Sequence, residues 1–226
     1  MEEESVKTVQ HFGFSRNGEF SSKLTSQVYK KEIHEHEVLL ANLGVDEKFG
    51  VNSVGTVPAA LTTFELLNSF PVDLVINPGT AGGFSARGGK IGDIYLPTKV
   101  LFHHREIPMG PYEEYGFGNF DVYDVSKLEK KLTFKKGVFS TSDSLTCRDH
   151  EVDFFNKNNV VVKEMEAGAI AYVCERFKVP YLGVKSITDI VDGPRVTSEE
   201  FLENLGTASD SLQNFLEVLL DNLLKE

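Results

Sequence analysis

Short apolar runs alternate with amphipathic segments along most of the chain. Five runs are rich in β-branched residues, and each ends where small or acidic residues begin: 72–77, 91–98, 137–141, 159–165 and 180–188. Continuous runs of this length are typical of strands buried on both faces of a largely parallel sheet. The glycine-rich stretch 78–89 predicts a turn after the first run, and 36–42 predicts a further strand.

Helical patterns separate these runs. They predict helices over 57–70, over 167–177 and from about Thr197 onward, where Thr197 can act as N-cap and Glu200 follows three residues later. Leucines spaced by three, four and seven residues form one stripe along the last helix, which we expect to dock on the protein's own core. No repeat or linker divides the chain. We therefore expect a single domain over 1–226, an α/β fold with a central mixed, largely parallel sheet flanked by helices.

Composition narrows the range of partners. The 226 residues include 23 Lys and Arg against 34 Asp and Glu, a formal net charge of −11, so nucleic acid and anionic membrane surfaces are poor partners. The sequence has no apolar stretch long enough for a membrane span and no signal-peptide pattern at its start, so we expect a soluble, cytoplasmic protein. The two cysteines, Cys147 and Cys174, predict ordinary reduced thiols.

Candidate chemistry lies directly after the apolar runs, because ligands of parallel sheets bind at the carboxyl ends of the strands. Thr80 offers a hydroxyl within a glycine-rich stretch, although a plain tight turn is an equal alternative there. Glu166 follows the fourth run, and its carboxylate suits a diol such as ribose, the alternative being a helix cap. Asp189 lies between apolar residues, which favours a raised pKa and a proton donor; the alternative is a turn cap, which we accept for Asp192.

Four segments of the sequence are informative together: NPGTAGG (77–83), STSDS (140–144), VVKEMEAGAIAYV (161–173) and VKSITDIVDG (184–193). In the order and spacing of these segments the chain resembles the 5′-methylthioadenosine/S-adenosylhomocysteine nucleosidases of the nucleoside phosphorylase superfamily. The segments 50–67 and 189–205 are most similar to the plant-type methylthioadenosine nucleosidases. The resemblance spans nearly the whole chain. It implies a nucleoside phosphorylase-like fold, a homodimer, and hydrolysis of methylthioadenosine to adenine and methylthioribose in methionine salvage, with no metal or cofactor.

The resemblance also implies roles for individual residues in the reaction. Asp189 matches the acid that protonates adenine N7, which makes the base a neutral leaving group. Glu4 matches the general base that deprotonates the attacking water, and Thr80 helps to hold that water. Glu166 matches the carboxylate that grips the ribose hydroxyls and faces the oxocarbenium-like transition state, while Met165 flanks the sugar.

Further residues correspond to the walls of the family's nucleoside site. Leu145 and Thr146 fall where backbone groups bind the adenine edge, and Asp143 matches an acid close to the purine. Val54 and Ile107 correspond to the pocket for the 5′-alkylthio group, part of which the dimer partner supplies in this family.

The sequence departs from the family pattern at several points. Members carry an apolar strand immediately upstream of the acidic stretch, and this sequence begins at Met1 without it, so we expect the activation of water by Glu4 to be the step most affected. Pro78 and Ser142 replace small residues, and Lys185 replaces the arginine of bacterial members. Two alternatives stay open, a phosphate-dependent phosphorylase and a catalytically impaired nucleoside-binding member. The sequence also leaves open whether S-adenosylhomocysteine is a substrate.

Overall fold

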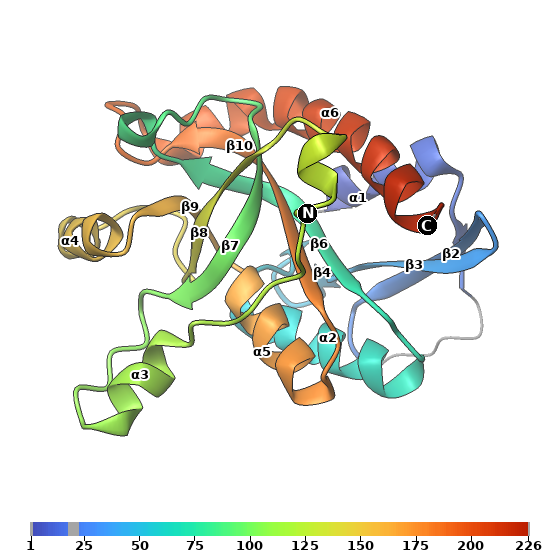
Figure 1. The fold of residues 1–226 in the computed structure, drawn as a ribbon, viewed down its shortest axis with the longest axis horizontal. Helices are drawn as coiled ribbons and strands as arrows, with labels where there is room; N and C mark the ends of the chain where they lie inside the picture. Colours follow the sequence, from blue (N-terminus) through green and yellow to red (C-terminus); the bar gives the residue numbers. More distant parts are fainter. Residues whose placement is uncertain (1, 18–22, 226) are drawn as a thin grey trace.

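Five strands form the centre of the fold. The computed structural model describes residues 2–17 and 23–225, with side chains from Ser5 onward within those ranges. The central strands are β6 (Val75–Gly83), β7 (Ile94–Phe102), β8 (Lys135–Thr141), β9 (Val160–Glu164) and β10 (Tyr181–Ile190). They close into a barrel in the order β10-β6-β9-β8-β7 (Figure 1). The pairs β10–β6, β7–β8 and β8–β9 are parallel, and β10–β7 and β6–β9 are antiparallel, which confirms the predicted mixed, largely parallel sheet.

The helices of the described chain lie around this barrel. They are α1 (Glu2–Phe12), α2 (Thr56–Ser69), α3 (Pro111–Phe117), α4 (Asp149–Lys157), α5 (Ala167–Phe177) and α6 (Thr197–Leu224). Helix α6 runs along one side of the barrel against β10, and α2 and α5 pack together at another side (Figure 1). The leucine stripe of α6 packs on barrel residues, as predicted, through Leu212, Leu216 and Leu219. None of the described helices is both long enough and apolar enough to cross a membrane.

Smaller elements complete the chain. An antiparallel sheet contains β1 (Ser15–Arg16), β2 (Gln27–Ile33) and β3 (His36–Asn42), so the prediction of a strand over 36–42 is confirmed. The pair β4 (Val45–Asp46) and β5 (Val51–Asn52) leads into α2, and two 3₁₀ turns, Ser85–Arg87 and Leu128–Lys130, lie in connections. Residues 2–12, which precede this sheet, form the helix α1 rather than a strand.

The predicted turn after the first apolar run is wrong in its first half. Strand β6 begins at Val75 and continues through the glycine-rich stretch to Gly83, paired with β10 along its whole length. The glycines serve close packing: a Cβ at Gly82 would lie 2.8 Å from Oδ2 of Asp189, and one at Gly79 would lie 3.0 Å from Nζ of Lys185. Their missing side chains give space to the polar groups of β10.

The predicted cap of the last helix is also wrong. Val196, not Thr197, occupies the N-cap of α6, and no side chain there bonds to the helix end. The carboxylate of Glu200 instead accepts a hydrogen bond of 2.9 Å from the backbone N–H of Ile190 at the end of β10. The Glu200 side chain, which the local motif would use for capping, is therefore engaged in a tertiary hydrogen bond instead.

Candidate active site

A cavity of about 510 Å³ opens at the carboxyl ends of β6, β9 and β10. Helices α1 and α2 and strand β3 complete its wall. Most of the residues predicted to bind or act on a substrate line this one cavity, namely Val54, Thr80, Leu145, Met165, Glu166 and Asp189. The sequence order of these residues spans more than half of the chain, so the fold itself assembles the site.

Asp189 owes its position to an irregularity in β10. The pairing with β6 shifts between Ile187 and Asp189, so that Asp189 lies opposite Gly82. The side chain is buried, with 3% of the residue exposed, and the hydroxyl of Thr188 donates a 2.9 Å hydrogen bond to Oδ1. Burial raises the pKa of Asp189, and the negative charge of Glu200 acts in the same direction, against the Thr188 bond and the positive charge of Lys163. A carboxyl group of this kind holds its proton to higher pH than an ordinary aspartate.

Glu164 and Glu166 lie two residues apart but have different partners. Oε2 of Glu164 accepts hydrogen bonds from the backbone N–H groups of Glu166 (2.8 Å) and Ala167 (2.6 Å), and its Oε1 accepts from the Thr141 hydroxyl. Thr141 in turn accepts a 2.8 Å bond from the N–H of Gly168. The first turn of α5 is thus capped by Glu164 and Thr141, which leaves the carboxylate of Glu166 to the cavity.

The carboxylate of Glu166 is held from two sides. Oε1 accepts a 3.0 Å hydrogen bond from the backbone N–H of Gly55, and Oε2 lies 4.0 Å from Nζ of Lys185. Lys185 is 2% exposed and lies 3.5 Å from Oε2 of Glu164 as well. Burial raises the pKa of Glu166, Lys185 opposes that effect, and Glu164 adds to it. Lys185 therefore stabilises two neighbouring carboxylates, the buried Glu164 and the partly buried Glu166. In the sequence, Lys185 stood out only as the replacement of an arginine.

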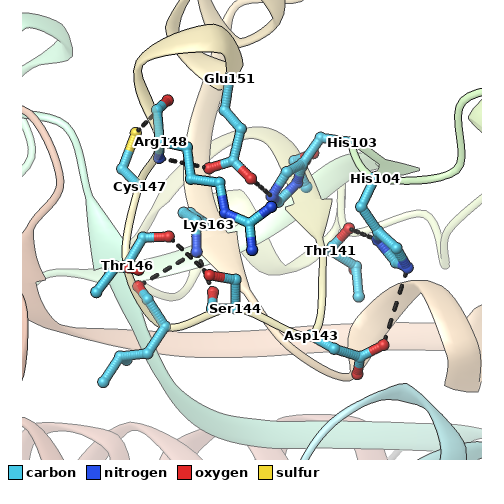
Figure 2. Close-up of polar contacts among 12 residues, drawn as sticks. His103, His104, Thr141, Asp143, Ser144, Thr146, Cys147, Arg148, Glu151 and Lys163 are labelled. Atoms are coloured by element: carbon cyan, nitrogen blue, oxygen red, sulfur yellow. Dashed lines mark hydrogen bonds and ion pairs between the residues drawn. The ribbon is translucent and has the colours of Figure 1, made fainter.

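Three predicted residues do not line the cavity. Asp143 caps α2, whose N-cap is Gly55: its carboxylate accepts 2.6 Å and 2.7 Å bonds from the backbone N–H and hydroxyl of Thr56, and it lies 3.8 Å from His104 (Figure 2). Thr146 turns its carbonyl to the hydroxyl of Ser144. Ile107 lies in the connection between β7 and α3, away from the cavity of this single chain.

Glu4 lies partly outside the described residues. Its backbone belongs to α1, and its side chain is not among those described. The next residues of the same helix that face inward, Ser5 and Thr8, line the cavity, and Ser5 accepts a 3.2 Å hydrogen bond from the Asn42 side chain. Helix α1 therefore borders the site.

The charges that line the cavity include the lysines Lys163 and Lys185 and the carboxylates of Glu164, Glu166 and Asp189, and no arginine lines it among the described residues. The same residues contain no cluster of three or more His, Cys, Asp or Glu that could hold a metal ion. A carboxyl group with a raised pKa and a second carboxylate in one cavity make a site that can give a proton to one part of a ligand and hold hydroxyls or positive charge at another.

Comparison with known proteins agrees with this geometry. A family model described as the phosphorylase superfamily matches residues 1–221. The chain is 41% identical over 205 residues to a 5′-methylthioadenosine/S-adenosylhomocysteine nucleosidase of Arabidopsis thaliana, covering 91% of this chain and 81% of the relative. It is 36% identical over 215 residues to a 5′-methylthioadenosine nucleosidase of the same plant, covering 94% and 80%.

Solved structures agree as well. The structure of Arabidopsis thaliana 5′-methylthioadenosine nucleosidase in apo form superposes with a TM-score of 0.95 at 34% identity, over 99% of this chain and 92% of that one. The nucleoside phosphorylase-like fold is thereby confirmed. The chain belongs to the phosphorylase superfamily and, within it, to the family of the 5′-methylthioadenosine/S-adenosylhomocysteine nucleosidases.

Proposed function

We propose that this protein hydrolyses the N-glycosidic bond of 5′-methylthioadenosine and releases adenine and methylthioribose, as a step of methionine salvage. The observation that carries the proposal is the buried Asp189 with its raised pKa in the same cavity as Glu166. The relatives that share the fold and up to 41% of the sequence are methylthioadenosine nucleosidases by name. The reaction needs no metal or cofactor.

Asp189 is the general acid of the proposed reaction. It gives its proton to N7 of adenine while the bond between the base and the sugar breaks, so that the base leaves without negative charge. Burial keeps the carboxyl group protonated, and the hydroxyl of Thr188 orients Oδ1. The positive charge of the transition state then develops on the sugar.

Glu166 faces that positive charge. Its carboxylate accepts hydrogen bonds from the ribose hydroxyls and stabilises the oxocarbenium-like sugar, with Met165 beside it on the cavity wall. The N–H of Gly55 and the ammonium of Lys185 hold the carboxylate in place before the substrate arrives. Preorganised charge of this kind avoids the cost of reorienting the group during the reaction.

Water attacks the sugar in the last part of the proposal. Glu4 on α1 takes the proton of that water, and Thr80 on β6 helps to position it. Water is favoured over phosphate because the cations on the described cavity wall are already engaged: Lys163 donates to backbone carbonyls, and Lys185 faces Glu164 and Glu166. Phosphorylases bind phosphate with free, usually bidentate, cationic groups.

The 5′ end of the substrate lies by Val54 in this proposal. Ile107 reaches the same pocket only from a second copy, so the active form in this proposal is a homodimer. Its proposed location is the cytoplasm. Apolar side chains exposed on α2 and on 109–115 support a contact between copies, among them Val57, Phe64, Met109, Tyr112 and Tyr115.

The proposal is tested by adenine release from 5′-methylthioadenosine, followed by the absorbance change of the base, with S-adenosylhomocysteine assayed in parallel. We expect turnover of methylthioadenosine, with the larger substrate slower. Binding of the nucleoside without release of adenine would contradict the proposal and would favour an impaired, nucleoside-binding member of the family.

A further inference from the structure

A buried cation on the cavity wall takes no chemical step in the proposed reaction. Lys163 lies on β9, is 4% exposed and lines the cavity. Its ammonium donates hydrogen bonds to the backbone carbonyl of Ser144 and, over 3.2 Å, to that of Leu145 (Figure 2). Both acceptors belong to the connection between β8 and α4, which has no helix or strand of its own. The ammonium of Lys163 thus donates hydrogen bonds to these two carbonyls, which have no partner strand in a sheet.

The far end of the same connection is held by the opposite charge. Glu151 on α4 is also 4% exposed, and its Oε2 accepts a 2.9 Å hydrogen bond from the backbone N–H of Arg148. Lys163 and Glu151 therefore fix the two ends of 144–148 from two different elements (Figure 2). Charged groups make stronger hydrogen bonds to backbone than neutral ones, so these bonds hold the backbone of the segment in place where Leu145 lines the cavity.

The position of Lys163 relative to Asp189 indicates which part of the cavity it serves. In the barrel, Lys163 lies opposite Gly82 across the β9–β6 pair, and Asp189 lies opposite Gly82 across the β6–β10 pair. Directly paired residues point to the same face of a sheet, and Gly82 has no side chain to separate its neighbours. Lys163 and Asp189 therefore face each other across Gly82, at the end of the cavity where the proposed acid meets the base.

Opposing effects act on the ammonium of Lys163. Burial lowers the pKa of Lys163, and the negative charges of Glu151, Asp189 and Glu164 limit that fall. The neighbouring His103 has its pKa lowered to about 3 by burial and by Lys163, so this histidine is neutral at pH 7. The imidazole therefore adds no second positive charge beside the ammonium.

We infer that Lys163 is a positioning residue that fixes the backbone of Ser144 and Leu145 at the base side of the cavity, and so sets the affinity for adenine rather than for the sugar. The inference rests on the proposed function, which puts the base beside Asp189. It concerns binding, and binding of free adenine can be measured without turnover.

The test is the calorimetric Kd for adenine in matched variants. Lys163→Met combined with Glu151→Gln removes two buried charges of opposite sign, so the net charge of the region is unchanged, while the side-chain carbonyl of the introduced glutamine still accepts a hydrogen bond from Arg148. We expect the Kd for adenine to rise about tenfold, because two charge-assisted bonds that hold the segment are lost. The single variant Lys163→Met is measured beside it, with thermal unfolding as a check on folding.

Two controls separate positioning from general damage. Lys135→Met on β8 removes a lysine that bonds to the carbonyl of Gly88 and to Asp93, outside the cavity, and we expect a Kd within about twofold of the unsubstituted protein. Glu166→Gln changes the sugar side and should also leave the Kd for adenine within about twofold.

An unchanged Kd in the Lys163 variants would overturn the inference, and so would an equal rise in Lys135→Met or in Glu166→Gln. An unsubstituted protein that binds adenine but releases none from methylthioadenosine would instead defeat the proposed function and leave the role of Lys163 in binding intact.

Discussion

At the scale of single residues, three carboxylates differ in role because their partners differ. Glu164 is engaged by two backbone N–H groups and a hydroxyl, so it is structural. Glu166 has one backbone N–H and a lysine at 4.0 Å, and it keeps capacity for a ligand. Asp189 has one hydroxyl partner and a buried site that favours its protonated form. Hydrogen-bond partners, more than residue type, assign each acid its function.

The first prediction concerns Asp189→Asn. The amide keeps the shape of the side chain but cannot give up a proton at useful rate, so kcat for adenine release should fall by about a thousandfold while nucleoside binding changes by less than about fivefold. The matched control is Asp192→Asn, because Asp192 bonds to the backbone of Ser85 and Ala86 outside the cavity. An active Asp189→Asn protein would remove Asp189 as the acid.

The second prediction concerns the pH dependence of kcat. A general acid must be protonated, so kcat should fall on the alkaline side as pH rises through the raised pKa of Asp189. The charge of Glu200 helps to raise that pKa, whereas Lys163 lowers it. Glu200→Gln, which keeps an acceptor for Ile190, should therefore move the alkaline limb to lower pH, and Lys163→Met should move it to higher pH. If the alkaline limb of the kcat profile stays in place in both variants, Asp189 is not the group whose titration sets that limb.

The third prediction concerns Glu166→Gln. Glutamine still accepts the hydrogen bond from Gly55 but carries no charge, so we expect KM for methylthioadenosine to rise by about fivefold and kcat to fall by about tenfold or more. Steady-state kinetics checks both numbers. Unchanged kinetics would return Glu166 to a structural role at the start of α5.

At the scale of elements, some helices and strands follow from the local sequence pattern, whereas others depend on tertiary contacts. Helix α5 begins and ends at the predicted residues, because its apolar face and its flanking strands are both marked in the sequence. The short helices α3 and α4 were not predicted, since they have only 7 and 9 residues and a helical period cannot repeat often enough over that length to be recognised. Strand β6 runs through glycines that usually mark a turn, and close contact with side chains of β10 and the residue after it explains them: Lys185 at Gly79, Asp189 and Val191 at Gly82, and Ile187 at Gly83.

The residues of the site likewise divide into those that the sequence pattern could predict and those that it could not. Thr80, Glu166 and Asp189 could be predicted as neighbours because each follows or ends an apolar run, and such ends meet at one edge of a sheet. Asp143 could not be placed, because its partner Thr56 is 87 residues away and belongs to a helix whose N-cap is Gly55. The closure of the sheet into a barrel could not be predicted from the sequence either, because apolar runs indicate strands but not which strands pair.

The fourth prediction belongs to the junction of β8, β9 and α5. Thr141→Val removes the hydroxyl that accepts from the N–H of Gly168 and donates to Glu164, leaving a buried donor without a partner. We expect the free energy of unfolding in urea to drop by about 1–3 kcal/mol, with adenine release from the folded protein within about threefold. Thr98→Val, at an exposed position of β7, is the control and should change stability by less than about 0.5 kcal/mol. Equal stability of the two variants would contradict the capping role of Thr141.

At the scale of the whole molecule, acidity and exposed apolar surface fit a nucleoside enzyme made of two copies. The net charge of −11 disfavours phosphorylated ligands, and the cavity is lined by the carboxylates of Glu164, Glu166 and Asp189. Exposed apolar residues occur on α2 and at 109–115, near α3, and both elements lie toward the same side of the molecule as α5 (Figure 1). In the proposed homodimer, a second copy covers these residues and supplies its Ile107 to the 5′ pocket of its neighbour.

The fifth prediction follows from that surface. Sedimentation velocity should find a species of twice the 25.2 kDa chain mass, and Phe64→Glu on α2 should shift the protein toward a single copy. We expect the KM for methylthioadenosine to rise in that variant because the 5′ pocket loses a wall. An unsubstituted protein that sediments as one copy and is fully active would contradict the dimer.

Whether water or phosphate attacks the sugar can be measured directly. Adenine release from 5′-methylthioadenosine is followed in phosphate-free buffer and again with added phosphate, and the sugar product is identified by mass. If water is the nucleophile, as we propose, the rates in the two buffers are equal and the product is free methylthioribose. Release that depends strictly on phosphate, with methylthioribose 1-phosphate as the product, would contradict the proposal.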